Sequence, residues 1–162
     1  MRIWSIVRKL NFWQLTRLAF LMVQRPRFIF PTLYATRKTM TLCNELYGKA
    51  HHNNGIENAF RHALWNALIG KKVFEISGNE TKSVLWAKRV TDLHEKIAPN
   101  DELATTMDLH NNKVGRDYFK EVKNESEEKM VHFIREQLSY AKLISKINEI
   151  DSYGNELVYI EN

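Results

Sequence analysis

The chain has little cysteine, little proline and no long hydrophobic run. Cys43 is the single cysteine among 162 residues, which excludes an internal disulfide framework and a zinc site built from several cysteines. The longest apolar run covers residues 18–23, whereas a membrane-spanning helix needs about 20 apolar residues and the core of a signal peptide about 7–15. We therefore expect an intracellular, cytoplasmic domain with neither a spanning segment nor a cleavable signal.

Acidic residues are missing from residues 1–44, which contain eight basic residues. The remaining 118 residues contain 16 basic and 19 acidic ones, so the net charge of +5 arises from the N-terminal part of the chain. Six aromatic residues are interleaved with these basic residues: Trp4, Phe12, Trp13, Phe20, Phe28 and Phe30. A basic amphipathic segment such as residues 1–30 can lie on an anionic membrane surface, or its apolar face can close the core. No nucleic-acid recognition motif accompanies it, so nucleic acid is not expected as a specific partner.

Pro26, Pro31 and Pro99 stand at the boundaries of segments with helical periodicity. The pattern predicts helices over residues 11–24, 31–47, 56–76, 80–98, 101–122 and 124–147. Asn124 with Glu127 resembles a capping box at the start of the last one. Residues 153–160 change to a turn and a short strand, or a small hairpin. The expected fold is all-α: a single domain over residues 1–162, a bundle of about six helices with a short C-terminal turn and strand.

Three of these helices each direct a histidine toward the packed interior. His62 shares a stripe of small and apolar residues with Asn66, one turn away on the same helix. His94 lies beside the apolar stripe of the next helix, and His110 lies within the stripe of the helix after that, with Asn111 at its edge. A buried polar group without a partner costs about 1–3 kcal/mol, so these residues should bond one another or bind a ligand. The pattern indicates either a functional polar site or a structural hydrogen-bond network.

The carboxylates near these histidines differ in direction. Asp92 and His94 point about 160° apart on an ideal helix, while Glu95 lies between them and can join His94 at a helix edge. Asp108 points away from the histidine of its own helix, so it can hold the neighbouring helix in place or pair with Arg61. We therefore expect Glu95 to accompany His94, and Asp108 to have either a structural or a functional role.

Three segments in the middle of the chain resemble an uncharacterised bacterial domain family. They are NAFRHALWN over residues 58–66, TDLHE over 91–95 and MDLHNNKVGR over 107–116, and the family carries R-H-x-x-W-N, D-x-H-E and M-D-x-H-N-N-x-V-G-R. Some members are small stand-alone proteins, and others look like C-terminal modules of secreted or toxin-like proteins. The resemblance covers about residues 51–119, the motif-bearing helical core. It implies that these positions matter: Arg61, His62, Trp65, Asn66, Asp92, His94, Glu95, Asp108, His110, Asn111, Asn112 and Arg116.

These residue types favour a hydrolase. The expected catalytic residues are His62, His94, Glu95, His110, Asn66, Asn111 and Arg61, and the expected substrate-binding residues are Arg116, Asn112 and Asp108. Imidazoles and carboxylates are common ligands of zinc or a similar divalent ion, which lowers the pKa of a bound water. The expected metal ligands are His62, His94, His110 and, in addition, Asp92. Without a metal, the same groups serve as general acid and base, and the guanidinium groups of Arg61 and Arg116 favour a phosphodiester substrate.

The alternative function involves no catalysis. In this reading the protein is a peripheral membrane or partner-binding helical protein that uses the basic aromatic residues 1–30. Single histidine substitutions should abolish an enzymatic function, whereas a binding function should depend on the N-terminal third of the chain.

Overall fold

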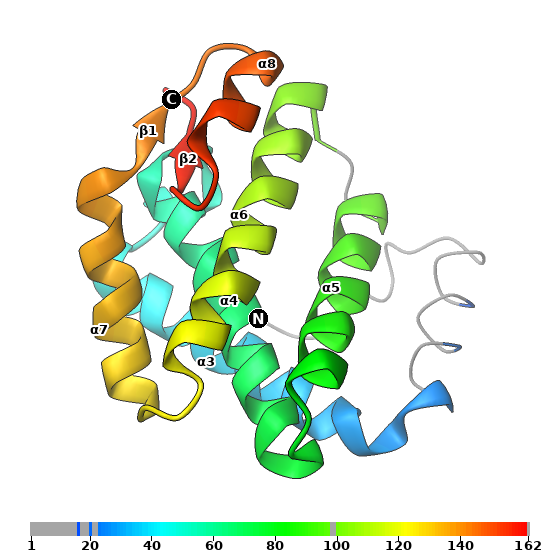
Figure 1. The fold of residues 1–162 in the computed structure, drawn as a ribbon. Helices are drawn as coiled ribbons and strands as arrows, with labels where there is room; N and C mark the ends of the chain where they lie inside the picture. The colour runs from blue at the N-terminus through cyan, green and yellow to red at the C-terminus, as the bar shows by residue number, and fades with distance from the viewer. Residues whose placement is uncertain (1–15, 17–19, 21–22, 98–99, 162) are drawn as a thin grey trace.

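The computed structural model describes residues 16, 20, 23–97 and 100–161, and its long helices form a bundle (Figure 1). The α-helices are α3 (Ile29–Tyr47), α4 (Ile56–Ser77), α5 (Glu80–Ile97), α6 (Glu102–Val122), α7 (Glu127–Gln137) and α8 (Ile147–Ile150). The shorter elements are the 3-10 turns η1 (Pro26–Phe28), η2 (Ala50–His52), η3 (Leu138–Tyr140) and η4 (Asp151–Tyr153), and the strands β1 (Lys142–Leu143) and β2 (Val158–Tyr159). The expected all-α fold with about six helices and a short C-terminal strand is confirmed.

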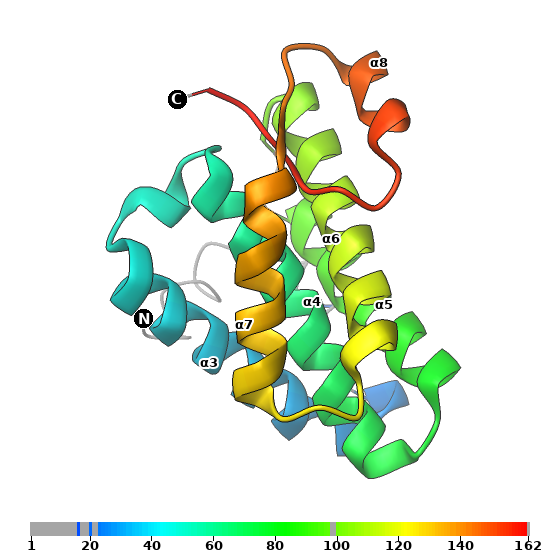
Figure 2. The same cartoon turned by 60° about the vertical axis from the view of Figure 1, so that its left-hand side comes forward.

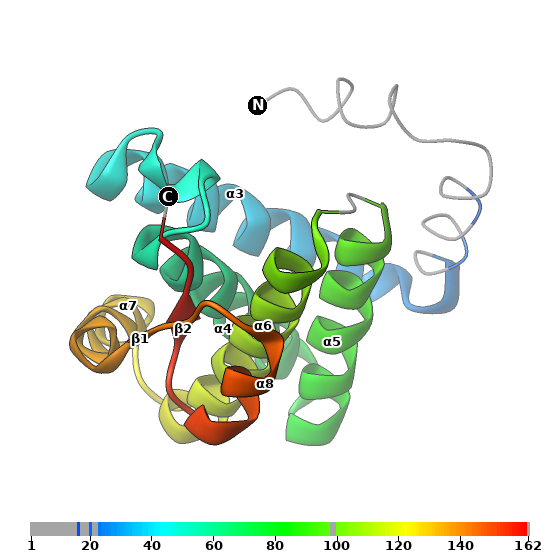
Figure 3. The same cartoon turned by 90° about the horizontal axis from the view of Figure 1, so that it is seen from above.

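Helix α4 lies at the centre of the bundle and contacts α3, α5, α6 and α7 (Figures 2 and 3). Helix α6 comes very close to α4 where Gly115 crosses Ala63. A Cβ atom at residue 115 would lie only 2.3 Å from the Ala63 carbonyl oxygen, so this crossing requires glycine. The crossing brings together the two helix faces that carry most of the polar residues described below.

Local signals explain where the helices begin. Asp101 caps α6 by accepting a 2.9 Å hydrogen bond from the backbone amide of Ala104 in the first turn. The last expected helix, over residues 124–147, differs from the structure at both ends. Ser126 rather than Asn124 caps α7, and α7 ends at Gln137. The residues that follow form η3 and β1, because they pack on the C-terminal segment.

The two C-terminal strands are parallel, with Lys142 opposite Val158 and Leu143 opposite Tyr159. The small hairpin considered from the sequence is therefore not formed, since a hairpin joins antiparallel strands. The segment between the strands, which contains α8 and η4, makes the crossover that a parallel pair needs. It lies along α6 at one end of the bundle (Figure 1).

Only part of the expected N-terminal helix is described. Residues 16, 20, 23 and 24 are helical, and the other residues of the range 11–24 lie outside the described residues, as do Trp4, Phe12 and Trp13. Phe28 belongs to the core, where its ring meets the Trp86 ring edge-on at a centroid distance of 5.3 Å. Phe20 and Phe30 are exposed.

None of the helices in the described part of the chain is long and apolar enough to span a membrane.

Candidate functional site

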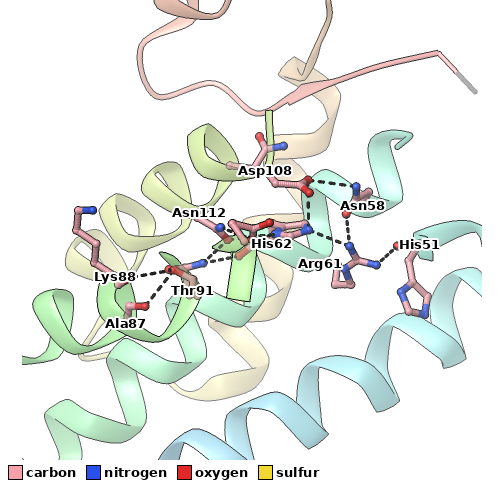
Figure 4. A network of polar contacts seen from close by, with 12 residues as sticks. His51, Asn58, Arg61, His62, Ala87, Lys88, Thr91, Asp108 and Asn112 are labelled. Atoms are coloured by element: carbon pink, nitrogen blue, oxygen red, sulfur yellow. Dashed lines mark hydrogen bonds and ion pairs between the residues drawn. The ribbon is translucent and has the colours of Figure 1, made fainter. Parts of the chain in front are cut away.

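Three helices contribute one continuous network of buried polar side chains (Figure 4). In each helix the contributing residues are four positions apart and therefore lie on one face. They are Asn58, His62 and Asn66 of α4, Thr91 and Glu95 of α5, and Asp108, Asn112 and Arg116 of α6. The faces that these three helices turn toward one another are therefore polar here, although the side chains are buried.

His62 lies in the middle of this network. A nitrogen of the Arg61 guanidinium is 2.8 Å from its Nε2 atom, and because a guanidinium only donates, Nε2 accepts. The ring proton then resides on Nδ1, which donates to Oδ1 of Asn112 at 3.1 Å. Burial lowers the pKa of His62 well below its ordinary value, and the charges of Arg61 and His94 lower it further. His62 is therefore a neutral imidazole with a defined tautomer.

Asp108 lies on the other side of the imidazole, with Oδ1 at 3.3 Å from Nε2 of His62. The Asn58 amide donates to the same oxygen at 3.3 Å. Burial raises the pKa of Asp108 from 3.8 to about 7, the charge of Glu95 adds to this increase, and Arg61 opposes it. Asp108 therefore changes its protonation state close to neutral pH.

Glu95 provides the second carboxylate of the network. Its Oε1 atom accepts a 3.1 Å hydrogen bond from the Asn112 amide and lies 3.7 Å from Nδ1 of His62. Burial raises the pKa of Glu95, although the hydrogen bond from Asn112 counteracts part of this increase. Asn112 thus connects the imidazole to Glu95, since its amide oxygen accepts from His62 and its amide nitrogen donates to Glu95.

Asn66 joins all three helices one turn further along. Its Nδ2 donates to Oδ1 of Asn112 at 2.6 Å, and its Oδ1 accepts from the Thr91 hydroxyl at 3.2 Å and from the Arg116 guanidinium at 3.0 Å. Several partners on both amide atoms fix its orientation. Because both amide atoms of Asn66 are fully hydrogen-bonded, this part of the network is structural, and it holds Asn112 in place.

Arg61 supplies the positive charge beside the two carboxylates. Its guanidinium donates to Oδ1 of Asn58 at 2.6 Å and to the backbone carbonyl of His51 in η2. Figure 4 shows it between these groups and His62. The pairing of Arg61 with Asp108 considered from the sequence is electrostatic here, because the hydrogen bonds of Arg61 go to its other neighbours.

His94 lies at the solvent side of this cluster. Its side chain is exposed, and its ring meets the ring of half-buried Trp65 edge-on at 5.2 Å. The surrounding atoms and the charge of Arg61 lower the pKa of His94. Asp92, on the same helix, forms an ion pair with Lys88. The charge of His94 affects the pKa of His62, so this aromatic pair lies at one solvent-facing edge of the cluster.

The structure places His110 and Asn111 against the C-terminal segment. Nε2 of His110 donates to the Glu156 carbonyl at 2.8 Å. The Asn111 amide donates to the Val158 carbonyl at 2.8 Å and accepts from the Val158 amide at 3.0 Å, as a neighbouring strand would. Both residues thus connect α6 to the residues that lead into and form β2.

One group in the described part of the chain has the composition of a metal site: His62, Glu95 and Asp108, with one candidate ligand atom each, all within 4.8 Å of one another. It shares only His62 with the expected set of His62, His94, His110 and Asp92. Asn58 and Thr91 themselves were not singled out from the sequence. Their positions, four residues before His62 and Glu95, are the signal that indicates them.

Comparison with known proteins yields one match. A family model described as a domain of unknown function (DUF6973) matches residues 19–142, a range that includes the whole polar network. No curated protein and no solved structure matches the chain.

Proposed function

The chain belongs to this family of unknown function, and from the geometry of the polar cluster we propose that it is a hydrolase acting on a phosphodiester. The observation that supports this proposal is the contact between neutral His62 and Asp108, whose pKa is about 7. A general base is most effective when its pKa lies near the working pH. Buried groups with displaced pKa values are also typical of catalytic sites, because a fold gains no stability from them.

Each side chain has a role in the proposed reaction. Asp108 takes the proton of a water molecule that attacks phosphorus and returns a proton to the leaving oxygen. Asn58 donates to Oδ1 of Asp108 and positions the carboxylate. Nε2 of His62 can accept a hydrogen bond from Asp108 once Asp108 is protonated, and the guanidinium of Arg61 offsets the negative charge that develops on the phosphoryl oxygens. His62 and Asp108 are almost fully buried, so the substrate has to enter at the solvent edge formed by His94 and Trp65.

A divalent ion such as zinc, held by His62, Glu95 and Asp108, is the second form of this proposal. Such an ion would lower the pKa of a bound water. Arg61 already donates to Nε2 of His62 at 2.8 Å, so ligation through this atom requires the guanidinium to move. The metal-free form is therefore preferred, and the bacterial, toxin-like setting implied by the motif resemblance belongs to the same proposal.

The test compares the wild type with Asp108→Asn and His62→Gln on nucleic acid, phospholipid and a small phosphodiester, with and without a chelator. We expect Asp108→Asn to lose about 10²–10⁴-fold in rate, the usual contribution of a general acid or base. His62→Gln should lose less, because His62 acts through Asp108. His132→Asn is the matched control, because His132 is an exposed histidine paired with Glu136 on α7. Activity that survives Asp108→Asn would exclude the proposed base, and activity lost with the chelator would favour the metal form.

A further inference from the structure

A hollow of about 460 Å³ lies at one end of the bundle, between η1, the end of α4 and the start of α5. Arg25, Arg27 and Lys82 contribute cationic side chains to its wall, and Ile76 and Phe28 contribute apolar ones. No acidic residue is among the residues that line it. We refer to it as the basic hollow.

The acidic residues next to the basic hollow in sequence have other partners. Glu75 forms ion pairs with Lys71 and Lys72, and Glu80 forms one with Lys123. These carboxylates are therefore compensated by lysines outside the hollow. The three cations of the hollow give this end of the molecule a local positive charge that attracts an anionic partner.

Large apolar side chains are exposed at the same end. Val23 is 78% exposed, Phe30 81% and Ile76 53%, and several large apolar side chains exposed at one end are more informative than a single one. The Lys72 ammonium lies 5.1 Å from the centre of the Tyr34 ring, so these positions of α3 and α4 are neighbours. Phe30 is one turn before Tyr34 and Ile76 one turn after Lys72, and Figures 1 and 2 show the start of α3 beside the end of α4.

We propose that this end of the bundle docks on an anionic phospholipid membrane. The basic hollow receives the phosphates of the lipid headgroups, and Val23, Phe30 and Ile76 enter the interface between headgroups and acyl chains. The combination selects a membrane over nucleic acid, which would meet the same cations but leave these apolar side chains in water. The proposal concerns binding and is independent of the proposed hydrolase activity.

The test measures co-sedimentation of the full chain with phosphatidylcholine vesicles that contain or lack phosphatidylserine. We expect binding only to the vesicles that contain phosphatidylserine, with an affinity that falls as salt is raised. Replacing Arg25, Arg27 and Lys82 together by Gln should weaken binding at least roughly tenfold, because each basic residue near an anionic surface contributes about fivefold. The control variant replaces three lysines elsewhere by Gln and so removes the same charge. They are Lys49 in the loop after α3, Lys129 in α7 and Lys142 in β1.

A second variant tests the apolar contribution. Phe30→Ser with Ile76→Ser changes two exposed side chains and should weaken vesicle binding while the melting temperature stays unchanged. Equal loss in the charge control, or unchanged binding in the hollow variant, would overturn the proposal. A third outcome would also overturn it. If a labelled DNA duplex competes with the vesicles, and Phe30→Ser with Ile76→Ser does not change DNA binding, the basic hollow binds nucleic acid instead.

Discussion

Asp108 and His62 are 3.3 Å apart, and burial moves their pKa values in opposite directions. Desolvation disfavours the charged form of each group, so the carboxyl retains its proton to a higher pH and the imidazole loses its proton at a lower pH. The Asn58 amide donates to Oδ1 of Asp108, and the Asn112 amide oxygen accepts from Nδ1 of His62. Asp108 thus changes its protonation state close to neutral pH, and His62 stays neutral, next to the fixed charge of Arg61.

The raised pKa of Asp108 predicts how stability changes with pH. A carboxyl whose pKa rises from 3.8 to about 7 on folding contributes stability that is present below pH 4 and lost as pH rises through 7. Asp108→Asn removes this dependence, so the variant should gain roughly 2–4 kcal/mol in unfolding free energy relative to wild type between pH 4 and pH 8. Denaturant titrations across this range measure the gain. Asp92→Asn, at the ion pair with Lys88, serves as the control, and a pH-independent difference for Asp108→Asn would contradict the assignment.

His110 differs from His62 in its partner. Nε2 of His110 donates to the Glu156 carbonyl. The shorter side chain in His110→Asn cannot reach this carbonyl, so the variant should lower the unfolding free energy by about 1 kcal/mol. Faster amide hydrogen exchange in β2 should accompany the loss, and the hydrolase activity should persist. A variant that keeps its melting temperature but has no activity would instead support the catalytic role expected for His110 from the sequence.

At the scale of the elements, the polar network depends on how closely α4 and α6 approach each other. The contact of Gly115 with the Ala63 backbone leaves no space for a side chain, and a backbone cannot rearrange as a side chain does. The same two helices carry His62, Asp108 and Asn112. Separating them would therefore disturb the network before it disturbed the outer helices.

Gly115→Ala tests this dependence. We expect a loss of about 3 kcal/mol, at the upper end of the usual cost of overpacking, and a fall in melting temperature on the order of 10 °C. Gly70→Ala is the matched control, because its new Cβ atom would meet the Phe119 ring at 2.8 Å, and a ring can shift where a backbone cannot. Equal losses in the two variants would show that the α4–α6 crossing is not the more constrained contact.

At the scale of the whole molecule, Cys43 reports the integrity of the bundle. Its side chain is buried, and burial raises the pKa of the thiol to about 12. Only the thiolate reacts with a disulfide reagent, so the native protein should react at pH 8 no faster than it unfolds. Labelling with a chromogenic disulfide reagent, with and without denaturant, measures this rate. Rapid stoichiometric labelling of the native protein would contradict the packing of α3 on α4.

The sequence predicted a helix correctly wherever its ends and its buried face depend on residues close together in the chain. Apolar periodicity and a cap such as Asp101 act within one or two turns, so the helices over residues 29–47, 56–77, 80–97 and 102–122 were predicted to within about two residues. The end of α7 and the parallel pairing of β1 with β2 were not predicted. Both depend on contacts between residues about 16 positions apart, which no short window contains.

For the site, the sequence by itself determined that His62 and Asn66 face inward together, because residues four apart share a helix face and theirs is lined with small residues. It could not determine which neighbours they meet. A position on an apolar stripe predicts burial, but the rotation of each helix against the next depends on packing, here on the Gly115 crossing. The tertiary structure thus placed Glu95 and Asp108 beside His62 and turned His110 toward Glu156 of the C-terminal segment.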